Sequence, residues 1–119
     1  MIPFHEITKL FASDPMHPFT VEIEFCVRES AEFSECWMGK TPERKELLIE
    51  GEEPSPVRYW FGLKKDGTAA YDYRCFADFA AAPVFSGKSL EQIWDQVELL
   101  SIDGCDPAER LRHYLNTMK

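Results

Sequence analysis

The chain has 119 residues, which is long enough for one domain with a buried core, and we expect residues 1–119 to fold as a single domain. Hydrophobic residues make up 45% of the sequence and aromatic residues 13%, which excludes a disordered chain. The formal net charge is −8, and residues 22–53 hold ten glutamates against four bases. This negative charge disfavours nucleic acids and anionic membranes as partners, whereas a basic protein remains a candidate partner.

The chain opens with a predicted helix. Apolar residues recur there at helical spacing, at Phe4, Ile7, Leu10 and Phe11. Pro3 suits the first helical position, and Ser13-Asp14-Pro15 is expected to end the helix because the residue before a proline avoids the helical conformation.

The clearest strand follows, with alternating apolar and polar side chains over residues 19–28. We expect residues 20–27 to form an antiparallel strand with Phe19, Val21, Ile23 and Phe25 buried, and with Glu22 and Glu24 exposed. Residues 32–38 are predicted to form a second strand, with Phe33 and Trp37 on one side and Cys36 and Met38 on the other.

Residues 40–56 contain Gly51, three prolines and much of the acidic block, so they are interpreted as a loop. Within this loop, Leu47-Leu48-Ile49 is expected to form a short strand or an anchoring turn, because a structureless loop of that length is unusual.

A hairpin is predicted next, from a strand over residues 57–63 and a second one over residues 68–73. Asp66-Gly67 between them is a strong signal for a two-residue turn. The first strand is apolar on both sides, because Trp60 occupies the face that is usually polar in a half-exposed antiparallel sheet. Either something covers that second face, or Trp60 is an exposed ring with a function.

Helices dominate the last third of the chain. Residues 75–82 are predicted to form a short helix with Phe76, Phe79 and Ala80 turned inward. Capping boxes at Ser89 and at Asp106 predict two more helices, and both residues are expected to be N-caps. The apolar face of the first of these two helices would consist of Leu90, Ile93, Trp94 and Val97, and that of the second of Ala108, Leu111, Tyr114 and Leu115. Residues 98–102 are either a last strand or the exit of the preceding helix.

This order predicts an α+β fold, with an antiparallel sheet of about four to five strands and helices packed on one face. The segment at the start lacks the basic and apolar stretches of a secretory signal, and no run reaches the ~20 apolar residues of a membrane-spanning helix. The four cysteines have neither C-x-x-C nor zinc-finger spacing. We therefore expect a cytoplasmic protein with reduced thiols and without disulfides, metal or cofactor.

Catalytic motifs are missing from the sequence. It has no Gly-rich phosphate loop, no G-x-S-x-G and no H-E-x-x-H, and its three histidines are scattered, with His113 on the solvent side of the last predicted helix. The candidate ligand-binding residues are therefore the aromatic residues and the arginine that would face a cleft between sheet and helices, although core packing explains the aromatic residues as well: Trp37, Trp60, Tyr71, Tyr73 and Arg74.

Three functions remain open. The first is a non-enzymatic interaction module, homodimeric through the sheet face around Trp60, with residues 40–56 folding over that face as the monomeric alternative. The second is a small-molecule-binding protein or enzyme with an aromatic pocket. The third is an acidic inhibitor or immunity-type protein that covers a basic partner with residues 22–53. The lack of a convergent polar cluster favours the first, so an enzyme is not expected.

Overall fold

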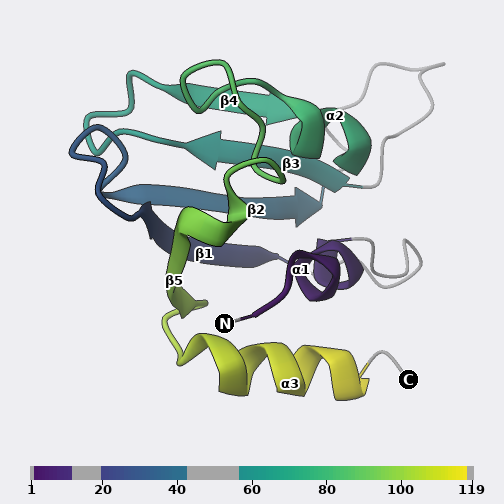
Figure 1. The fold of residues 1–119 in the computed structure, drawn as a ribbon. Coiled ribbons are helices and arrows are strands. Elements are labelled where there is room, and N and C mark those ends of the chain that lie inside the picture. Colours follow the sequence, from purple (N-terminus) through teal and green to yellow (C-terminus); the bar gives the residue numbers. More distant parts are fainter. Residues whose placement is uncertain (1, 12–19, 43–56, 118–119) are drawn as a thin grey trace, which may run out of the picture.

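The computed structural model describes residues 2–11, 20–42 and 57–117 of the chain, and it confirms the predicted α+β fold. Five antiparallel strands form one sheet in the order β4-β3-β2-β1-β5 (Figure 1). The strands are β1 (Val21–Val27), β2 (Cys36–Pro42), β3 (Val57–Gly62), β4 (Ala70–Tyr73) and β5 (Val97–Ile102), and the helices are α1 (Phe4–Phe11), α2 (Phe76–Ala81), the short 3-10 helix η2 (Trp94–Gln96) and α3 (Pro107–Thr117). No helix in this part of the chain is long and apolar enough to cross a membrane.

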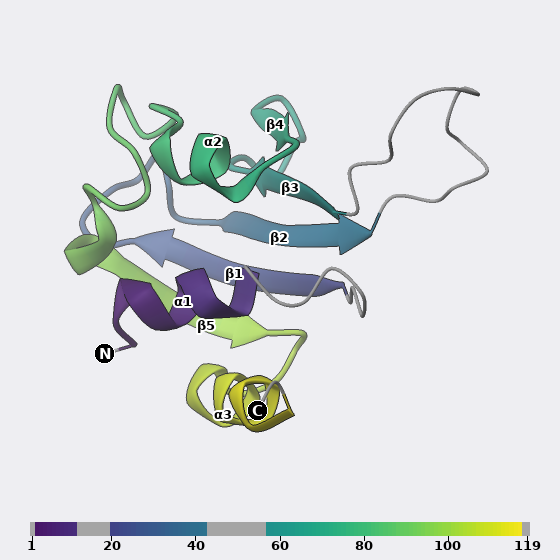
Figure 2. The ribbon, with the colours of Figure 1, turned by 90° about the vertical axis from the view of Figure 1, so that its right-hand side faces the viewer.

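One face of the sheet, here called the covered face, carries the core. Helices α1 and α2 both lie over it, whereas α3 lies beyond the β5 edge (Figures 1 and 2). Its buried strand residues include Val21, Ile23, Phe25, Met38 and Phe61. Phe61 of β3 stacks on Phe79 of α2 with ring centroids 4.1 Å apart, so aromatic packing joins this helix to the sheet.

The prediction for β1 is confirmed over the described residues. Val21, Ile23 and Phe25 are buried and Glu22 is exposed, as the alternation of the side chains requires. Glu24 differs from the prediction, because it is only partly exposed; it lies directly across from Trp37 of β2. Phe19 and the predicted helix end at residues 13–15 lie outside the described residues.

The second strand starts later and runs further than predicted. It covers Cys36–Pro42 instead of residues 32–38, because residues 28–35 form the connection from β1. In that connection, the Phe33 carbonyl accepts a hydrogen bond from the Val27 amide at 2.8 Å, and the Phe33 ring packs on Phe85. Lys40, expected at the start of a loop, is therefore a fully buried residue of β2. The expected short strand at residues 47–49 lies outside the described residues.

The β3–β4 hairpin is confirmed, but its turn is longer than predicted. The Leu63 amide donates to the Ala69 carbonyl at 2.9 Å, so residues 64–68 form the loop in place of a two-residue Asp-Gly turn. The Asp66 carboxylate accepts hydrogen bonds from the Thr68 amide and hydroxyl, which lowers the pKa of Asp66. This local bonding explains why β4 begins at Ala70 and not at Thr68.

The capping box at Ser89 forms, but the α-helix expected after it does not. The Gln92 amide donates to Ser89 Oγ at 3.3 Å, and Gln92 Oε1 accepts from the Ser89 amide at 2.8 Å. Turns and the 3-10 helix η2 follow, and Val97 already starts β5. Residues 98–102 thus belong to a strand, and β-pairing with β1 takes the place of helix extension.

Helix α3 is capped as predicted, because Asp106 Oδ2 accepts from the Glu109 amide at 3.1 Å. Its burial is narrower than expected: Leu111 is buried, Tyr114 and Leu115 are half-buried, and Ala108 is exposed. The helix lies at the edge of the sheet, where one row of side chains suffices for contact. Asp103 links the helix to β1, because its carboxylate accepts hydrogen bonds from Arg110 Nε at 3.3 Å and from the Tyr114 hydroxyl of α3, and from the Glu22 amide of β1.

Candidate functional site

The opposite side of the sheet, here called the open face, is covered by no helix of the described part of the chain (Figures 1 and 2). Direct cross-strand partners share a face, and the register places two tryptophans there, each across from a glycine. Trp37 of β2 pairs with Gly62 of β3, and Trp60 of β3 pairs with Gly39 of β2. Trp37 is 40% exposed and Trp60 is half-buried.

The Trp60 indole lies against Gly39 of β2. A Cβ on Gly39 would come within 2.7 Å of Trp60 Cζ2 and within 2.1 Å of the Val21 carbonyl oxygen, so only glycine allows this contact. Trp60 Nε1 also donates to Thr41 Oγ1 at 3.1 Å. The indole is therefore held in place by packing and by a hydrogen bond, which fixes the centre of the open face.

Charges are divided across the open face. On the β1–β5 side the register adds three acids, Glu22, Glu24 and Glu98. On the β3–β4 side lies Arg58, and Lys64 and Lys65 in the adjoining loop border a recess of about 260 Å³ beside Trp37. Acids also lie close to these bases: Asp72 is 4.0 Å from Arg58, and Glu35 is 4.0 Å from Lys65. Glu24 and Glu35 line the same recess as the two lysines, and the Asp66 carboxylate is turned back onto Thr68.

The five residues predicted to bind a ligand are not brought together in one cleft. Trp37 and Trp60 lie on the open face, whereas Tyr71 and Tyr73 of β4 pair with Phe61 and Tyr59 and so share the covered face. Tyr71 is 41% exposed at the edge of the sheet, and Tyr73 packs against Phe61 and Phe79. Arg74 is exposed just after β4.

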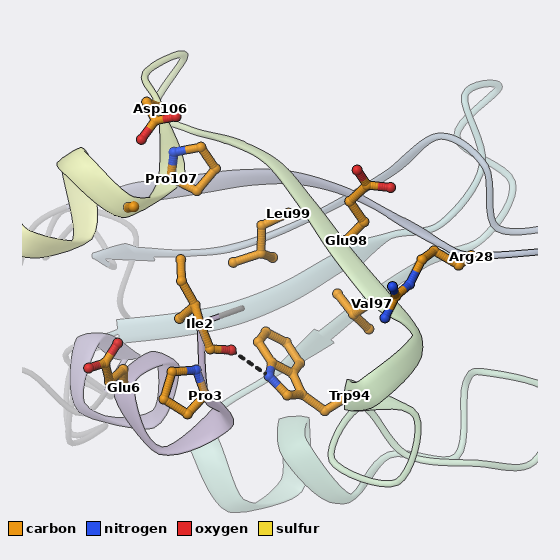
Figure 3. Close-up of a pocket in the computed structure, with 11 residues that line it drawn as sticks. Ile2, Pro3, Glu6, Arg28, Trp94, Val97, Glu98, Leu99, Asp106 and Pro107 are labelled. Atoms are coloured by element: carbon orange, nitrogen blue, oxygen red, sulfur yellow. Dashed lines mark hydrogen bonds between the residues drawn. The ribbon is translucent and has the colours of Figure 1, made fainter.

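A second surface lies where the N-terminal segment, β5 and α3 meet (Figure 3). This edge groove has a volume of about 590 Å³. Its walls are apolar: Ile2 and Pro3, then Trp94, Val97 and Leu99, then Pro107 and Ala108. Trp94 is 8% exposed, and its Nε1 donates to the Ile2 carbonyl at 2.9 Å, so one wall is built before any ligand arrives.

Sequence reasoning missed the edge groove. It placed Trp94 and Val97 on the face of a helix, and the groove unites three segments that are far apart along the chain. The alternation Val97-Glu98-Leu99 was the one signal for a strand at this position, and it is too short to reveal what lies beside that strand.

Among the described residues, metal-ligating and thiol groups are placed as follows. No group of three His, Cys, Asp or Glu residues among them is placed to hold a metal ion. Burial raises the pKa of the Cys36 thiol to about 12, so this cysteine stays protonated and is a poor nucleophile. Burial also raises the pKa of Cys26, helped by the neighbouring Glu98 carboxylate.

The fold and its two surfaces define an α+β protein with one covered sheet face, one open sheet face and a groove at the sheet edge. The chain matches no model of a protein family, and comparisons with curated proteins and with solved structures gave no match either.

Proposed function

We propose that the protein is a non-enzymatic interaction module that forms a homodimer through its open face. The observation that carries this proposal is the pair of tryptophans, Trp37 and Trp60, on a sheet face that no described helix covers. Monomers seldom leave such apolar surface exposed without a binding role, and a two-fold dimer is the commonest way to bury it.

The open face is large enough for this role. Strands lie ~4.8 Å apart and rise ~3.3 Å per residue, so five strands of about six residues span a flat area on the order of 500 Å². Side-chain relief increases the accessible area beyond that value, towards the roughly 800 Å² per partner of a standard interface.

Charge favours one arrangement of the two copies. With the two-fold axis parallel to the strands and over the central strand β2, β1 and β5 of one copy face β3 and β4 of the other. The side with Glu22, Glu24 and Glu98 then faces the side with Arg58, Lys64 and Lys65. An axis across the strands would instead place acids over acids. The first arrangement stacks two sheets with aligned strands, as in ordinary sheet packing.

The alternative, a small-molecule pocket lined by the predicted aromatic residues, has less support. Its residues are divided between the two faces of the sheet, so they offer no common cavity. An acidic inhibitor that binds a basic partner remains compatible with the acids on β1, and the edge groove bears on that possibility.

The test compares two exposed aromatic residues of equal exposure on opposite faces. Trp37→Ser removes the exposed ring from the open face, and Tyr71→Ser is the matched control on the covered side. Sedimentation equilibrium should give a dimer for the natural protein. The dissociation constant should rise at least about tenfold for Trp37→Ser and change by less than about threefold for Tyr71→Ser, because central buried tryptophans dominate interfaces.

Near-ultraviolet circular dichroism and thermal unfolding of both variants verify that they remain folded. A natural protein that stays monomeric up to about 100 μM, well above the affinity of a standard interface, would overturn the proposal. Equal weakening of the dimer by both substitutions would also contradict it, because it would place the contact away from the open face.

A further inference from the structure

The edge groove runs beside an edge strand. β5 ends the sheet order, with the strand β1 on one side and helix α3 beyond the other edge, and the groove lies between β5 and the start of α3. The Arg28 amide donates to the Gln96 carbonyl at 2.8 Å, and hydrogen-bonded pairs alternate along an antiparallel ladder. The backbone N–H and C=O groups of Val97 and Leu99 therefore point away from β1. The Val97 amide is consistent with this orientation, because it donates a hydrogen bond to the Trp94 carbonyl and not to β1.

The Leu99 amide and the Val97 and Leu99 carbonyls thus face the edge that borders the groove. An extended peptide can bind such an edge as an additional strand: backbone hydrogen bonds give affinity, and pockets for alternate side chains give specificity. Side chains of the added strand on the covered side would enter the apolar groove between Leu99, Trp94 and Ile2.

The rim of the groove is acidic. Glu6, Glu98 and Asp106 line it together with a single base, Arg28. Glu98 accepts only a weak hydrogen bond, from the Cys26 thiol at 3.8 Å, and Asp106 caps α3 with one oxygen. Within the described ranges, none of the three acids forms an ion pair.

The charges are also ordered along the strand. Asp106 and Glu6 lie towards the α3 end of the groove, whereas Arg28 lies near Val97, where β5 begins (Figure 3). Glu98 alternates with Val97 and Leu99, so its side chain lies on the open face, next to the outward-facing side chains of any added strand.

We propose that the edge groove binds an extended segment of a basic partner protein, which adds to β5 as an antiparallel strand with alternating apolar and basic residues. Its apolar side chains fill the groove, its outward basic side chains meet Glu98, and its amino-terminal end lies near Asp106 and Glu6. The groove and the β5 edge lie outside the open face of the proposed dimer, and Glu98 is a residue common to both surfaces.

Charge excludes two other occupants. A second copy of the chain would bring Glu98 and the rest of the acidic rim against an equally acidic rim, and like charges across a strand pair are destabilising. Residues 43–56 of the same chain carry five glutamates against Arg44 and Lys45, so their charge also mismatches the rim.

The test uses capped synthetic heptapeptides and calorimetry on the full chain. The probe alternates lysine and valine. One control has the same composition with the lysines and valines in two blocks, and a second is the alternating peptide with N-methyl groups on every other amide, which removes strand donors. We expect the alternating peptide to bind with a dissociation constant below about 1 mM, and each control to bind at least about tenfold more weakly.

Two charge reversals locate the site. Glu98→Lys should weaken binding of the alternating peptide at least about tenfold, and the matched reversal Glu32→Lys, at an exposed acid outside the groove lining, should change it less than about threefold. Failure of the alternating peptide to bind at about 1 mM would overturn the proposal. So would equal binding of the alternating and block peptides, or equal effects of the two reversals, because either result means attraction by net charge alone. The comparison of the alternating and block peptides uses the same protein for both, so its outcome does not depend on the dimer.

Discussion

Gly39 is the residue on which the open face depends. It lies where the Val21 carbonyl of β1 and the Trp60 indole of β3 both approach β2, and the two contacts leave no space for a Cβ. Gly62 is its counterpart across the same pair of strands, opposite Trp37, but a Cβ there would meet no atom closer than Trp37 Cβ at 4.0 Å. Glycine is therefore required on steric grounds at position 39, whereas position 62 has space for a larger side chain.

We predict that Gly39→Ala lowers the free energy of unfolding by roughly 1–3 kcal/mol or more, because the added methyl group forces backbone or indole to move. Urea unfolding monitored by tryptophan fluorescence measures this change. Gly62→Ala is the control, with an expected change within about 0.5 kcal/mol. If the two alanines cost the same, the close packing of Trp60 over β2 is wrong.

Lys40 shows how α1 is joined to the sheet at the scale of elements. Its side chain crosses the core from β2 and its Nζ donates to the Leu10 carbonyl at 2.9 Å, while the Tyr59 hydroxyl of β3 donates to the Phe11 carbonyl at 3.2 Å. Two carbonyls in the last turn of α1 thereby receive donors from two neighbouring strands. Burial lowers the pKa of Lys40 to about 8.

This lowered pKa predicts a pH dependence of stability with a definite sign. The unfolded chain holds the Lys40 proton up to its ordinary pKa of 10.5, whereas the folded protein releases it near 8. Between these values the unfolded state binds more protons, so the free energy of unfolding rises with pH. At about 1.4 kcal/mol per pKa unit, the gain is on the order of 3 kcal/mol.

Lys40→Met removes this titration while it keeps the length of the side chain. The free energy of unfolding of the natural protein, measured relative to Lys40→Met, should increase between pH 7.5 and pH 10.5, as the folded and unfolded pKa values dictate. The comparison cancels the other titrating groups, including Tyr59, whose pKa is raised by burial. Lys64→Met, at an exposed lysine, is the control for the loss of one positive charge. A flat difference for Lys40→Met would show that Lys40 is not buried as a cation.

Elements with a strong local signal were predictable from the sequence. The alternation in β1 and the Asp106 cap of α3 each fix a structure within a few residues, so tertiary contacts had little to change. Ser89 shows the limit: its capping box forms, yet the residues after it enter a 3-10 helix and β5, because pairing with β1 outweighs helix propensity. The burial of Lys40 could not be predicted, because a lysine in an alternating strand is normally expected to be exposed.

The candidate functional surfaces were predictable only in part. The two-sided apolarity around Trp60 is a local pattern, so the open face could be expected from sequence. The edge groove could not be, because it depends on how residues 2–3, 94–99 and 106–108 meet in space, and no local pattern encodes that meeting.

At the scale of the whole molecule, net charge and charge distribution act in opposite directions on the proposed dimer. Two copies with a formal charge of −8 each repel one another at long range. At short range, the acids of β1 and β5 in one copy of the proposed dimer face Arg58, Lys64 and Lys65 of the other copy, and these opposite charges attract one another. Salt separates the two effects, because the Debye length is about 30 Å at 0.01 M and about 3 Å at 1 M.

We therefore predict that the dimer is most stable at intermediate ionic strength. At about 0.01 M sodium chloride the repulsion between whole copies is felt, near 0.15 M it is screened while contacting charges still attract, and at about 1 M those contacts are screened too. Sedimentation equilibrium at the three concentrations should give the lowest dissociation constant at the middle one. The variant Glu24→Lys removes one attractive acid. Its dissociation constant should therefore rise less between about 0.15 M and about 1 M sodium chloride than that of the natural protein. A dimer that strengthens steadily with salt would contradict the proposed axis, because it would mean that acids of the two copies face one another.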